Sequence, residues 1–415
     1  MIARYLQLVL LLATLTGASA AGDESWPTYR HDTRRSGATP STLTLPLAPA
    51  WTHTAGKPRQ AWSGPAKWDA YSGNSGLQSM RNFDPCHYTT AADGHVYFGS
   101  SADDAAHCLD AATGKQVWTH FTNAPVRLPP SLADGLAWFG SDDGHAYCVD
   151  AKSGDLLWTK RAAPSDRLIA SNGKLISPWP VRTGVLIDRG KAWFTASLVP
   201  WERSYLYCVD ARTGSEKADG CFVTRHHEVT LQGAMLAGSD SVYIPQGRAA
   251  PLAFSRTDGK HTGTIGNAGG VTCVLLDNDR LLAGPENQKS GDSQIRLTAP
   301  GEKKPVATFN HTSRATVDGN IAYLHSGQKL RSLDIAESDG KDERWSVTRP
   351  APVELIVAGP HLILGYSGHV DILDTTDGKQ LATLEVEGTA HGLTVAAGRL
   401  FVSTDRGLIH AFAQP

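Results

Sequence analysis

The sequence predicts an all-β protein built from one repeated unit, and three observations support this prediction. The segment Asp110–Trp118 returns as Asp150–Trp158, and a third copy begins at Asp210. Each copy follows a short alternating run, which is typical of a half-buried strand. A second recurring piece, seen first at Asp93–Ser100, precedes each copy and carries an apolar run after a turn. Because a fixed period outweighs local propensity, these repeats predict the architecture.

The spacing of the second piece predicts how many units the chain contains. Aligned on Gly94, its copies lie at Gly94, Gly135, Gly190, Asp240, Asp279, Gly319, Pro360 and Gly398. Most copies are 38 to 41 residues apart, and two intervals are longer, at 55 and 50 residues. Four short strands in about forty residues make one propeller blade. The sequence therefore predicts an eight-bladed β-propeller of four-stranded antiparallel blades.

The side chains of the repeat explain the turn between the last two strands of a unit. Asp110 is expected to accept hydrogen bonds from backbone N–H groups two or three residues later. Gly114 supplies the positive φ that a bulged hairpin turn needs. Trp118 then faces inward, where burial of its ring removes about 150–250 Å² from water. We interpret these tryptophans as core packing between neighbouring sheets rather than as ligand contacts.

The N-terminal segment is expected to close the ring. The eighth unit lacks a fourth strand of its own, because only a few residues follow Phe412. Trp51 has the place in segment 47–53 that Trp118 has in its unit. We therefore predict that residues 47–53 complete the last blade and leave no open sheet edge.

The expected organisation is a signal peptide at 1–20, an N-terminal arm at 21–46 and a propeller at 47–415. Within the propeller, residues 54–86 form a long loop and residues 87–415 carry the repeats. The stretch 52–86 contains Trp62, Trp68 and Tyr71 among Gly, Ser and Pro. It is either a lid over one face or an ordered surface loop with packed aromatics.

Composition indicates an exported chain without a nucleic-acid partner. The net charge is −2 and no basic run stands out, whereas nucleic-acid binding needs clustered Lys and Arg. Arg4, the apolar run Leu6–Leu15 and Ala18–Ala20 read as a signal peptide cleaved near Ala20. The run is too short to span a bilayer. We expect a monomer, without a transmembrane segment or a lipid anchor, in the periplasm or outside the cell.

Six cysteines in an exported chain permit disulfides, but spacing alone does not give the pairs. Cys208 and Cys221 flank one turn on consecutive strands and are the best candidates for a bridge. Neither Cys-x-x-Cys nor Cys-x-x-Cys-His occurs, which argues against thioredoxin-type chemistry and covalent haem.

Several segments together resemble a known family. They are the opening Trp26–Gly37, the run Phe98–Asp104, Ala124–Arg127 and the Asp-Ala-x-Thr-Gly-x-x-x-Trp units. These resemble exported bacterial β-propellers with pyrroloquinoline-quinone-like repeats, the quinoprotein alcohol dehydrogenase-like superfamily. The resemblance covers essentially the whole chain after the signal peptide. It implies the fold, but this repeat is shared by quinone-dependent dehydrogenases and by non-catalytic scaffolds such as the propeller of the outer-membrane assembly machinery.

One face of the propeller is expected to carry a ligand site. Loops from outer to inner strands, and from second to third strands, meet on that face. The candidate ligand-binding residues there are Arg127, Arg167, Trp179, Arg182, His226, Glu228, Arg248, Glu286, Asn287 and Arg314. The arginines suit a carboxylate, a sulfate or a sugar acid. The alternative is that they cap carbonyls and pair with acids such as Asp103, Asp142 or Glu354.

Two further chemistries are alternatives for this face. A metal at His226 and Glu228 would need help from His311 or His391, and the alternative is that these are ordinary loop histidines. The resemblance to quinone enzymes implies calcium held by a Glu, an Asn and an Asp, a catalytic Asp and an adjacent cysteine pair. Glu286 and Asn287 offer the first two on one loop, but no adjacent cysteine pair exists.

The sequence therefore predicts no catalytic residue, no metal site and no definite cofactor. We expect a non-catalytic ligand-binding or assembly propeller whose partner is a small anionic or carbohydrate ligand or another protein. The first alternative is a pyrroloquinoline-quinone-dependent dehydrogenase with calcium. The second is a carbohydrate-active or glycan-binding protein that uses the arginine-rich face.

Overall fold

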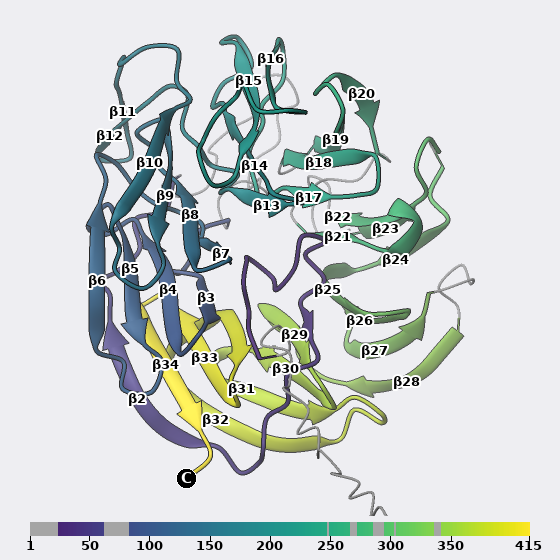
Figure 1. The fold of residues 1–415 in the computed structure, drawn as a ribbon. Coiled ribbons are helices and arrows are strands. Elements are labelled where there is room, and N and C mark those ends of the chain that lie inside the picture. Colours follow the sequence, from purple (N-terminus) through teal and green to yellow (C-terminus); the bar gives the residue numbers. More distant parts are fainter. Residues whose placement is uncertain are drawn as a thin grey trace, which may run out of the picture.

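A computed structural model describes residues 24–61, 83–246, 249–265, 272–284, 294–302, 304–335 and 342–415. The expected signal peptide and the loop aromatics Trp62, Trp68 and Tyr71 lie outside these ranges. The described chain consists of strands, turns and one 3-10 helix, η1 (Asp277–Asp279). Its sheets follow one another around a ring (Figure 1).

Six sheets are four-stranded and antiparallel, and each is formed by consecutive strands. The first three are β3 (Thr89–Ala92), β4 (His95–Ser100), β5 (Ala105–Asp110) and β6 (Gln116–Phe121); β7 (Ser131–Ala133), β8 (Leu136–Gly140), β9 (His145–Asp150) and β10 (Leu156–Arg161); and β13 (Leu186–Asp188), β14 (Lys191–Ala196), β15 (Ser204–Asp210) and β16 (Phe222–His226). The next three are β17 (Leu236–Ala237), β18 (Ser241–Gln246), β19 (Ala249–Ser255) and β20 (His261–Thr264); β21 (Thr272–Leu275), β22 (Leu281–Gly284), β23 (Gln294–Thr298) and β24 (Ala307–Asn310); and β25 (Thr312–Asp318), β26 (Ile321–Ser326), β27 (Lys329–Asp334) and β28 (Asp342–Thr348). A separate hairpin, β11 (Ile169–Ser171) and β12 (Lys174–Ile176), lies in the longer interval before β13.

The remaining strands form one eight-stranded sheet, which joins two four-stranded units. Its strands are β1 (Ala38–Thr39), β29 (Glu354–Ala358), β30 (His361–Gly365), β31 (Ser367–Asp374), β32 (Gln380–Ala396), β33 (Arg399–Thr404), β34 (Leu408–Ala413) and β2 (Ala48–Thr54). The long β32 pairs with β31 along its first part and with β33 along its last part. The N-terminal strand β2 pairs antiparallel with β34, with Trp51 opposite Ala411. The all-β propeller predicted from the repeat is confirmed, and β2 lies beside the last strand of the chain.

The repeated turns have the predicted hydrogen bonds. The backbone N–H of Thr113 donates to Asp110 Oδ1 at 2.8 Å, and that of Thr213 donates to Asp210 Oδ1 at 2.9 Å. Gly114 has φ of 70°, which a residue with a Cβ adopts only under strain. The hydroxyls of Thr113 and Thr213 donate to the same carboxylates, and these bonds, followed by those of the backbone, lower the pKa of Asp110 and Asp210.

Four tryptophans of the repeat each bind their own sheet to the next one. Trp118 Nε1 donates to the carbonyl oxygen of Ala151 at 2.9 Å, and Trp158 Nε1 donates to that of Ala211 at 3.0 Å. The same bond joins Trp51 to Ala111 at 3.1 Å and Trp345 to Thr375 at 2.8 Å. A Cβ added to Gly154 would lie 2.8 Å from the Trp118 ring. Glycine is therefore required in this turn for two reasons: its φ is positive, and the neighbouring indole ring occupies the space where a Cβ would lie.

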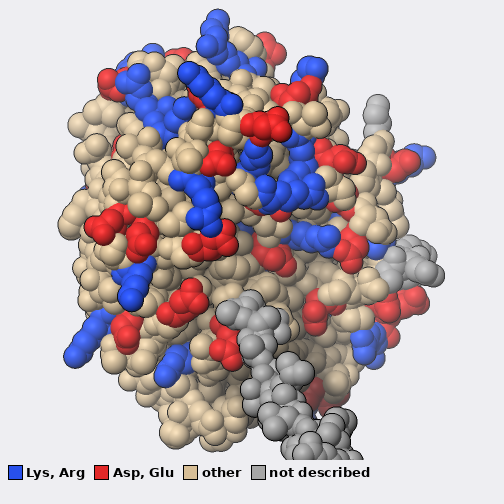
Figure 2. Space-filling model, viewed as in Figure 1, with Lys and Arg blue, Asp and Glu red and all other residues tan. Residues whose placement is uncertain are grey.

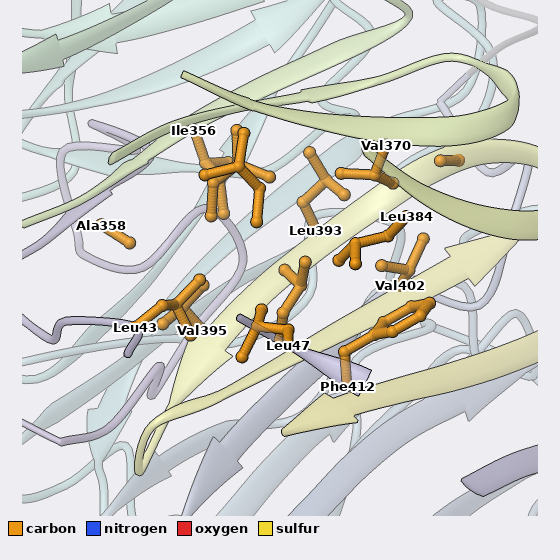
Figure 3. Close-up of a cluster of buried hydrophobic side chains, with 14 of the residues drawn as sticks. Leu43, Leu47, Ile356, Ala358, Val370, Leu384, Leu393, Val395, Val402 and Phe412 are labelled. Carbon is orange, nitrogen blue, oxygen red and sulfur yellow. The ribbon is translucent and has the colours of Figure 1, made fainter. Parts of the chain in front are cut away.

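Buried apolar side chains fill the spaces between neighbouring sheets. Figure 3 shows one such cluster, in which Leu43 and Leu47 lie with Val395, Val402 and Phe412. The chain preceding β2 thus contributes to the core of the last two units.

Candidate functional site

The described part of the N-terminal arm, residues 24–46, lies along one end of the ring. Its backbone carbonyl oxygens accept hydrogen bonds from the innermost strand of a unit, or from the turn that follows it. These bonds join Glu24 to Ala397, Trp26 to Ala91, Pro27 to Leu132, Thr33 to Ala237, Arg34 to Leu275, Ser36 to Val317 and Gly37 to Val357. Figure 1 draws the arm in purple across the middle of the ring. The arm therefore ties the innermost strands of seven units together at the end where those strands finish.

Arg35 is the most deeply buried basic residue of the arm, with 3% of its surface exposed. Its Nε donates to the carbonyl oxygen of Met235 at 2.9 Å. Its Nη1 donates to Thr28 Oγ1 at 2.8 Å and to the carbonyl oxygens of Tyr29 at 2.8 Å and Asp32 at 3.1 Å. Burial lowers the pKa of Arg35 to about 10. The guanidinium holds the bend of the arm and attaches it to the fourth unit.

Arg30 and Tyr29 fill the space inside the ring above the arm. Arg30 forms an ion pair with Glu354 and donates to the carbonyl oxygen of Ala315 at 2.8 Å. The ring of Tyr29 meets that of Tyr88 edge-on, with centroids 4.9 Å apart. Burial would lower the pKa of Arg30, but the Glu354 carboxylate outweighs it and raises the pKa. Burial and the same carboxylate raise the pKa of Tyr29.

The cavity beside these residues is small. Its walls include Tyr29, Arg30, Tyr88, Glu354 and His391, and its volume is about 20 Å³. That volume holds about one water molecule. A planar multi-ring cofactor does not fit there.

The opposite end of the ring carries a buried cluster of two arginines and two aspartates. Arg182 donates two parallel hydrogen bonds of 2.8 Å to Asp142, from Nε to Oδ1 and from Nη2 to Oδ2. Arg127 donates from Nε to Asp142 Oδ2 at 2.6 Å, and from Nη1 to Asp84 and to the carbonyl oxygen of Arg59. Paired in this way, the two arginines leave no net positive charge for an anionic ligand.

This cluster is shielded from solvent. Asp84 is 2% exposed and Arg182 is 1% exposed, and among the described residues Asp84 Oδ1 and Arg182 Nη1 have no hydrogen-bond partner. Burial raises the pKa of Asp84 to about 6 although Arg127 acts against this shift. Burial also acts to raise the pKa of Asp142, but the positive charges and hydrogen bonds of Arg127 and Arg182 outweigh it, so that this pKa is lowered.

The other predicted residues on this side are held by local contacts. The Arg167 guanidinium lies over the Trp179 ring, 4.9 Å from its centroid, and pairs with Glu202. Trp179 is buried, and its Nε1 donates to the carbonyl oxygen of Arg203 at 2.9 Å. Arg314 Nε donates to the carbonyl oxygen of Val353 at 2.9 Å. The carbonyl capping considered from the sequence is thus present at Arg314.

The histidine and acidic candidates do not converge. His226 ends β16 and packs edge-on against Phe254, with ring centroids 4.8 Å apart. Burial lowers its pKa to about 4, and His261 and His227 add to this effect. Glu228 lies beyond the strand with φ of 59° and is exposed, so it does not share a strand face with His226. Within the ranges described above, no three His, Cys, Asp or Glu side chains are placed to hold a metal ion. Arg248, Glu286 and Asn287 lie outside those ranges.

The proposed disulfide is not formed in this structure, since Cys208 and Cys221 are both free thiols. Sequence reasoning also missed the partners Asp84, Arg30 and Arg35. Only the polar character of the arm and of the long loop could have indicated them, because these contacts join segments far apart in the sequence.

Acidic and basic side chains lie interspersed on the arm side of the molecule, as Figure 2 shows. In the part of the chain that the structure covers, no helix has the length and apolar character needed to cross a bilayer.

Comparison with known proteins places these features in a family context. Residues 50–178 match the sequence model of a family described as "Outer membrane protein assembly factor BamB". A curated protein of the same name from Yersinia pestis is 25% identical over 237 residues, which is 51% of this chain. The match spans 60% of that relative's length.

Solved structures share the fold at low identity. Quinohemoprotein alcohol dehydrogenase from Comamonas testosteroni superposes with a TM-score of 0.65 at 13% identity, covering 96% of this chain and 82% of that one. BamB from Moraxella catarrhalis superposes with a TM-score of 0.55 at 14% identity, covering 81% of this chain and 99% of that one. Likeness at this level shows the fold and not the activity. The chain is therefore a β-propeller with the fold of these proteins, and its residues 50–178 are similar to the BamB family of pyrroloquinoline-quinone-like repeats.

Proposed function

We propose that this chain is a non-catalytic scaffold propeller of the bacterial cell envelope, located in the periplasm, that holds a protein partner during assembly. The observation that carries the proposal is the match of residues 50–178 to the BamB family, together with the curated relative of that name. The region of that match also carries most of the exposed apolar side chains.

Seven of the nine large apolar side chains that are exposed in the described ranges lie between Val117 and Trp201. They are Val117, Phe121, Leu156, Leu157, Leu168, Leu175 and Trp201. Trp201 is 81% exposed and Phe121 is 69% exposed. These residues come from the first three units and the hairpin between the second and third, and exposed apolar side chains on neighbouring units favour a protein partner over a free sugar or acid.

The hairpin β11–β12 carries one of these exposed side chains and is fixed to the units beside it. Lys174 Nζ donates to both carboxylate oxygens of Asp104 at 2.8 Å, which fastens the hairpin to the first unit. Ile176 packs with Ala124 and Leu198 beneath it. Leu175, on the same hairpin, is 61% exposed. A fixed hairpin with an exposed leucine is suited to contact another protein without first becoming ordered.

The described residues give no support for a quinone and its calcium, and the candidate ligands Glu286 and Asn287 lie outside the described ranges. The cavity beside Tyr29, Arg30 and Glu354 is too small for a planar multi-ring cofactor. At the opposite end, Asp84 and Asp142 are already bound by Arg127 and Arg182. Adding pyrroloquinoline quinone and calcium to purified protein, followed by dye-linked alcohol oxidation, tests this directly. Turnover would contradict the scaffold proposal.

The glycan-binding alternative loses its main support for a similar reason. This alternative needs guanidinium groups that are free to bind a ligand. Arg127 and Arg182 instead donate their hydrogen bonds to aspartates inside the protein. We therefore do not propose it as the function.

A crosslinking experiment tests the scaffold proposal. A photo-reactive amino acid placed at Leu175 or Trp201, in the source organism, should capture one defined envelope protein. Placement at Leu381, which is 42% exposed on β32, is the control and should capture much less. A strain lacking the gene should contain less assembled outer-membrane protein. Normal outer-membrane protein levels in that strain, or equal capture from all three positions, would refute the proposal.

A further inference from the structure

Three neighbouring units carry a cysteine at the same place. Cys108 on β5 lies opposite Trp118, Cys148 on β9 lies opposite Trp158, and Cys208 on β15 lies opposite Phe222. Each thiol is therefore beside the aromatic ring that fills the gap to the next sheet. All three cysteines are fully buried.

The residue before the aromatic ring differs in the third unit. In the first two units it is Val117 or Leu157, and the strand register shifts there, so that two residues of the outer strand face one residue of its partner. In the third unit the same position holds Cys221, and its backbone N–H donates to the carbonyl oxygen of Ala218 at 3.0 Å. A second thiol thus stands beside Cys208, and the charge of Cys221 adds to burial in raising the pKa of Cys208 to about 12.

A cation lies next to the outer thiol. Lys191 Nζ donates to Cys221 Sγ at 3.3 Å and also donates to the carbonyl oxygen of Asp219. Cys221 is partly exposed, whereas Cys208 is shielded beneath it. The ammonium stabilises negative charge on the Cys221 sulfur, which is the charge that this sulfur carries when it attacks a disulfide.

We propose that Cys221 and Cys208 form a thiol–disulfide exchange site on the outer edge of the third unit. The substrate class is a disulfide, either a small molecule or an exposed disulfide of a protein thiol oxidant. The Cys221 thiolate attacks one sulfur of that disulfide, forms a mixed disulfide and releases the other sulfur as a thiolate. Cys208 then gives up its proton and attacks the Cys221 sulfur, which expels the second thiolate. The protein loses two electrons and two protons, and the substrate disulfide becomes two thiols.

The other cysteines provide internal controls. Cys86 is 2% exposed and Cys273 is 8% exposed, and Cys108 and Cys148 have an aliphatic residue where the third unit has Cys221. Their thiols should therefore stay reduced under conditions that oxidise the Cys208–Cys221 pair.

Oxidised glutathione is a suitable probe for the folded, full-length protein. We expect a loss of two hydrogens in the intact mass, two fewer titratable thiols and one crosslinked peptide pair containing Cys208 and Cys221. Cys208→Ser should stop after the first step and keep glutathione on Cys221. Cys221→Ser should remain unmodified, because Cys208 is shielded.

Lys191→Met tests the role of the cation, and Lys152→Met, at an exposed lysine in the turn between β9 and β10 of the second unit, is the control. Lys191→Met should slow formation of the mixed disulfide by roughly threefold or more, and Lys152→Met should not. Circular dichroism and unfolding curves verify that each variant is folded. Glutathione found first on another cysteine of the folded protein, or all six thiols remaining reduced, would overturn the proposal.

Discussion

Arg35 Nε donates to the carbonyl oxygen of Met235 at 2.9 Å, although the two residues are 200 positions apart. This bond joins the N-terminal arm to the start of β17 in the fourth unit. Three more hydrogen bonds, all from Nη1, fix the guanidinium to the arm itself. The arm is thus part of the folded ring rather than a loose extension.

Arg35→Met should destabilise the protein by about 3 kcal/mol or more, because it leaves several buried oxygens without a donor. The matched control is Arg34→Met, since Arg34 is half exposed and its ion pair with Asp277 lies at the surface. That change should cost less than about 1 kcal/mol. Urea unfolding followed by tryptophan fluorescence measures both, and equal losses would show that Arg35 does not hold the arm.

Comparing Gly154→Ala with Gly135→Ala separates the cost of backbone strain in a turn from the cost of a clash with a neighbouring ring. Both positions have positive φ, 77° and 73°, so each change should cost about 1 kcal/mol in backbone strain. A Cβ at Gly135 meets nothing within 4 Å, whereas at Gly154 it would lie 2.8 Å from the Trp118 ring. We expect Gly154→Ala to cost at least about 1 kcal/mol more, because the indole must shift. Similar unfolding midpoints for the two variants would contradict this.

Trp118→Ala should cost about 3–5 kcal/mol, since it removes a buried ring and leaves the Ala151 carbonyl without its donor. Trp201→Ala is the control, because Trp201 is 81% exposed and makes no comparable contact. Its effect on stability should stay within about 0.5 kcal/mol. Thermal and urea unfolding report both values. A small effect at Trp118 would mean that the repeat tryptophans do not join the sheets.

His87 should make the stability depend on pH between about 4 and 6.5. It is 2% exposed with Nε2 3.0 Å from the Gly56 carbonyl oxygen, and burial lowers its pKa to about 4. Between that value and the ordinary histidine pKa, the unfolded chain binds more protons, so this contribution rises with pH and is lost on acidification. It amounts to about 3 kcal/mol at most.

Asp84 acts in the opposite direction over nearly the same range. Its pKa is raised to about 6, so its contribution is present at low pH and is lost as the pH rises towards 6. The test is therefore a difference between proteins. His87→Gln should reduce the gain in stability from pH 4 to 6.5 relative to the unmodified chain, while the same change at the exposed His227 should not. Parallel stability curves for all three proteins would refute the role of His87.

The local parts of the fold were predictable because neighbouring residues decide them. The carboxylate of Asp110 bonds to the N–H of Thr113 within one turn, and Gly114 is needed in that turn whatever surrounds it. The inward position of Trp118 follows from strand alternation. Even the place of β2 beside β34 was predictable, since Trp51 repeats the pattern of the other units.

The candidate site was predicted only as a set of residue types. The sequence places Arg127 and Arg182 in loops, but it does not decide whether they bind a ligand or internal acids. The structure pairs them with Asp84 and Asp142, and such ion pairs depend on which loops approach within about 3 Å. No periodicity in the sequence encodes that approach.

The sequence by itself determined the repeat, its turns, its docking tryptophans and the pairing of β2 with the last strand, because each rests on hydrogen bonds and burial within the pattern of one forty-residue unit or its neighbour. Only the tertiary structure decided the path of the arm, the pairing of Arg127 and Arg182 with acids, and the free thiols of Cys208 and Cys221 beside Lys191. Those features join segments that the arrangement of the sheets brings together, so their partners are chosen by distance in space and not by spacing along the chain.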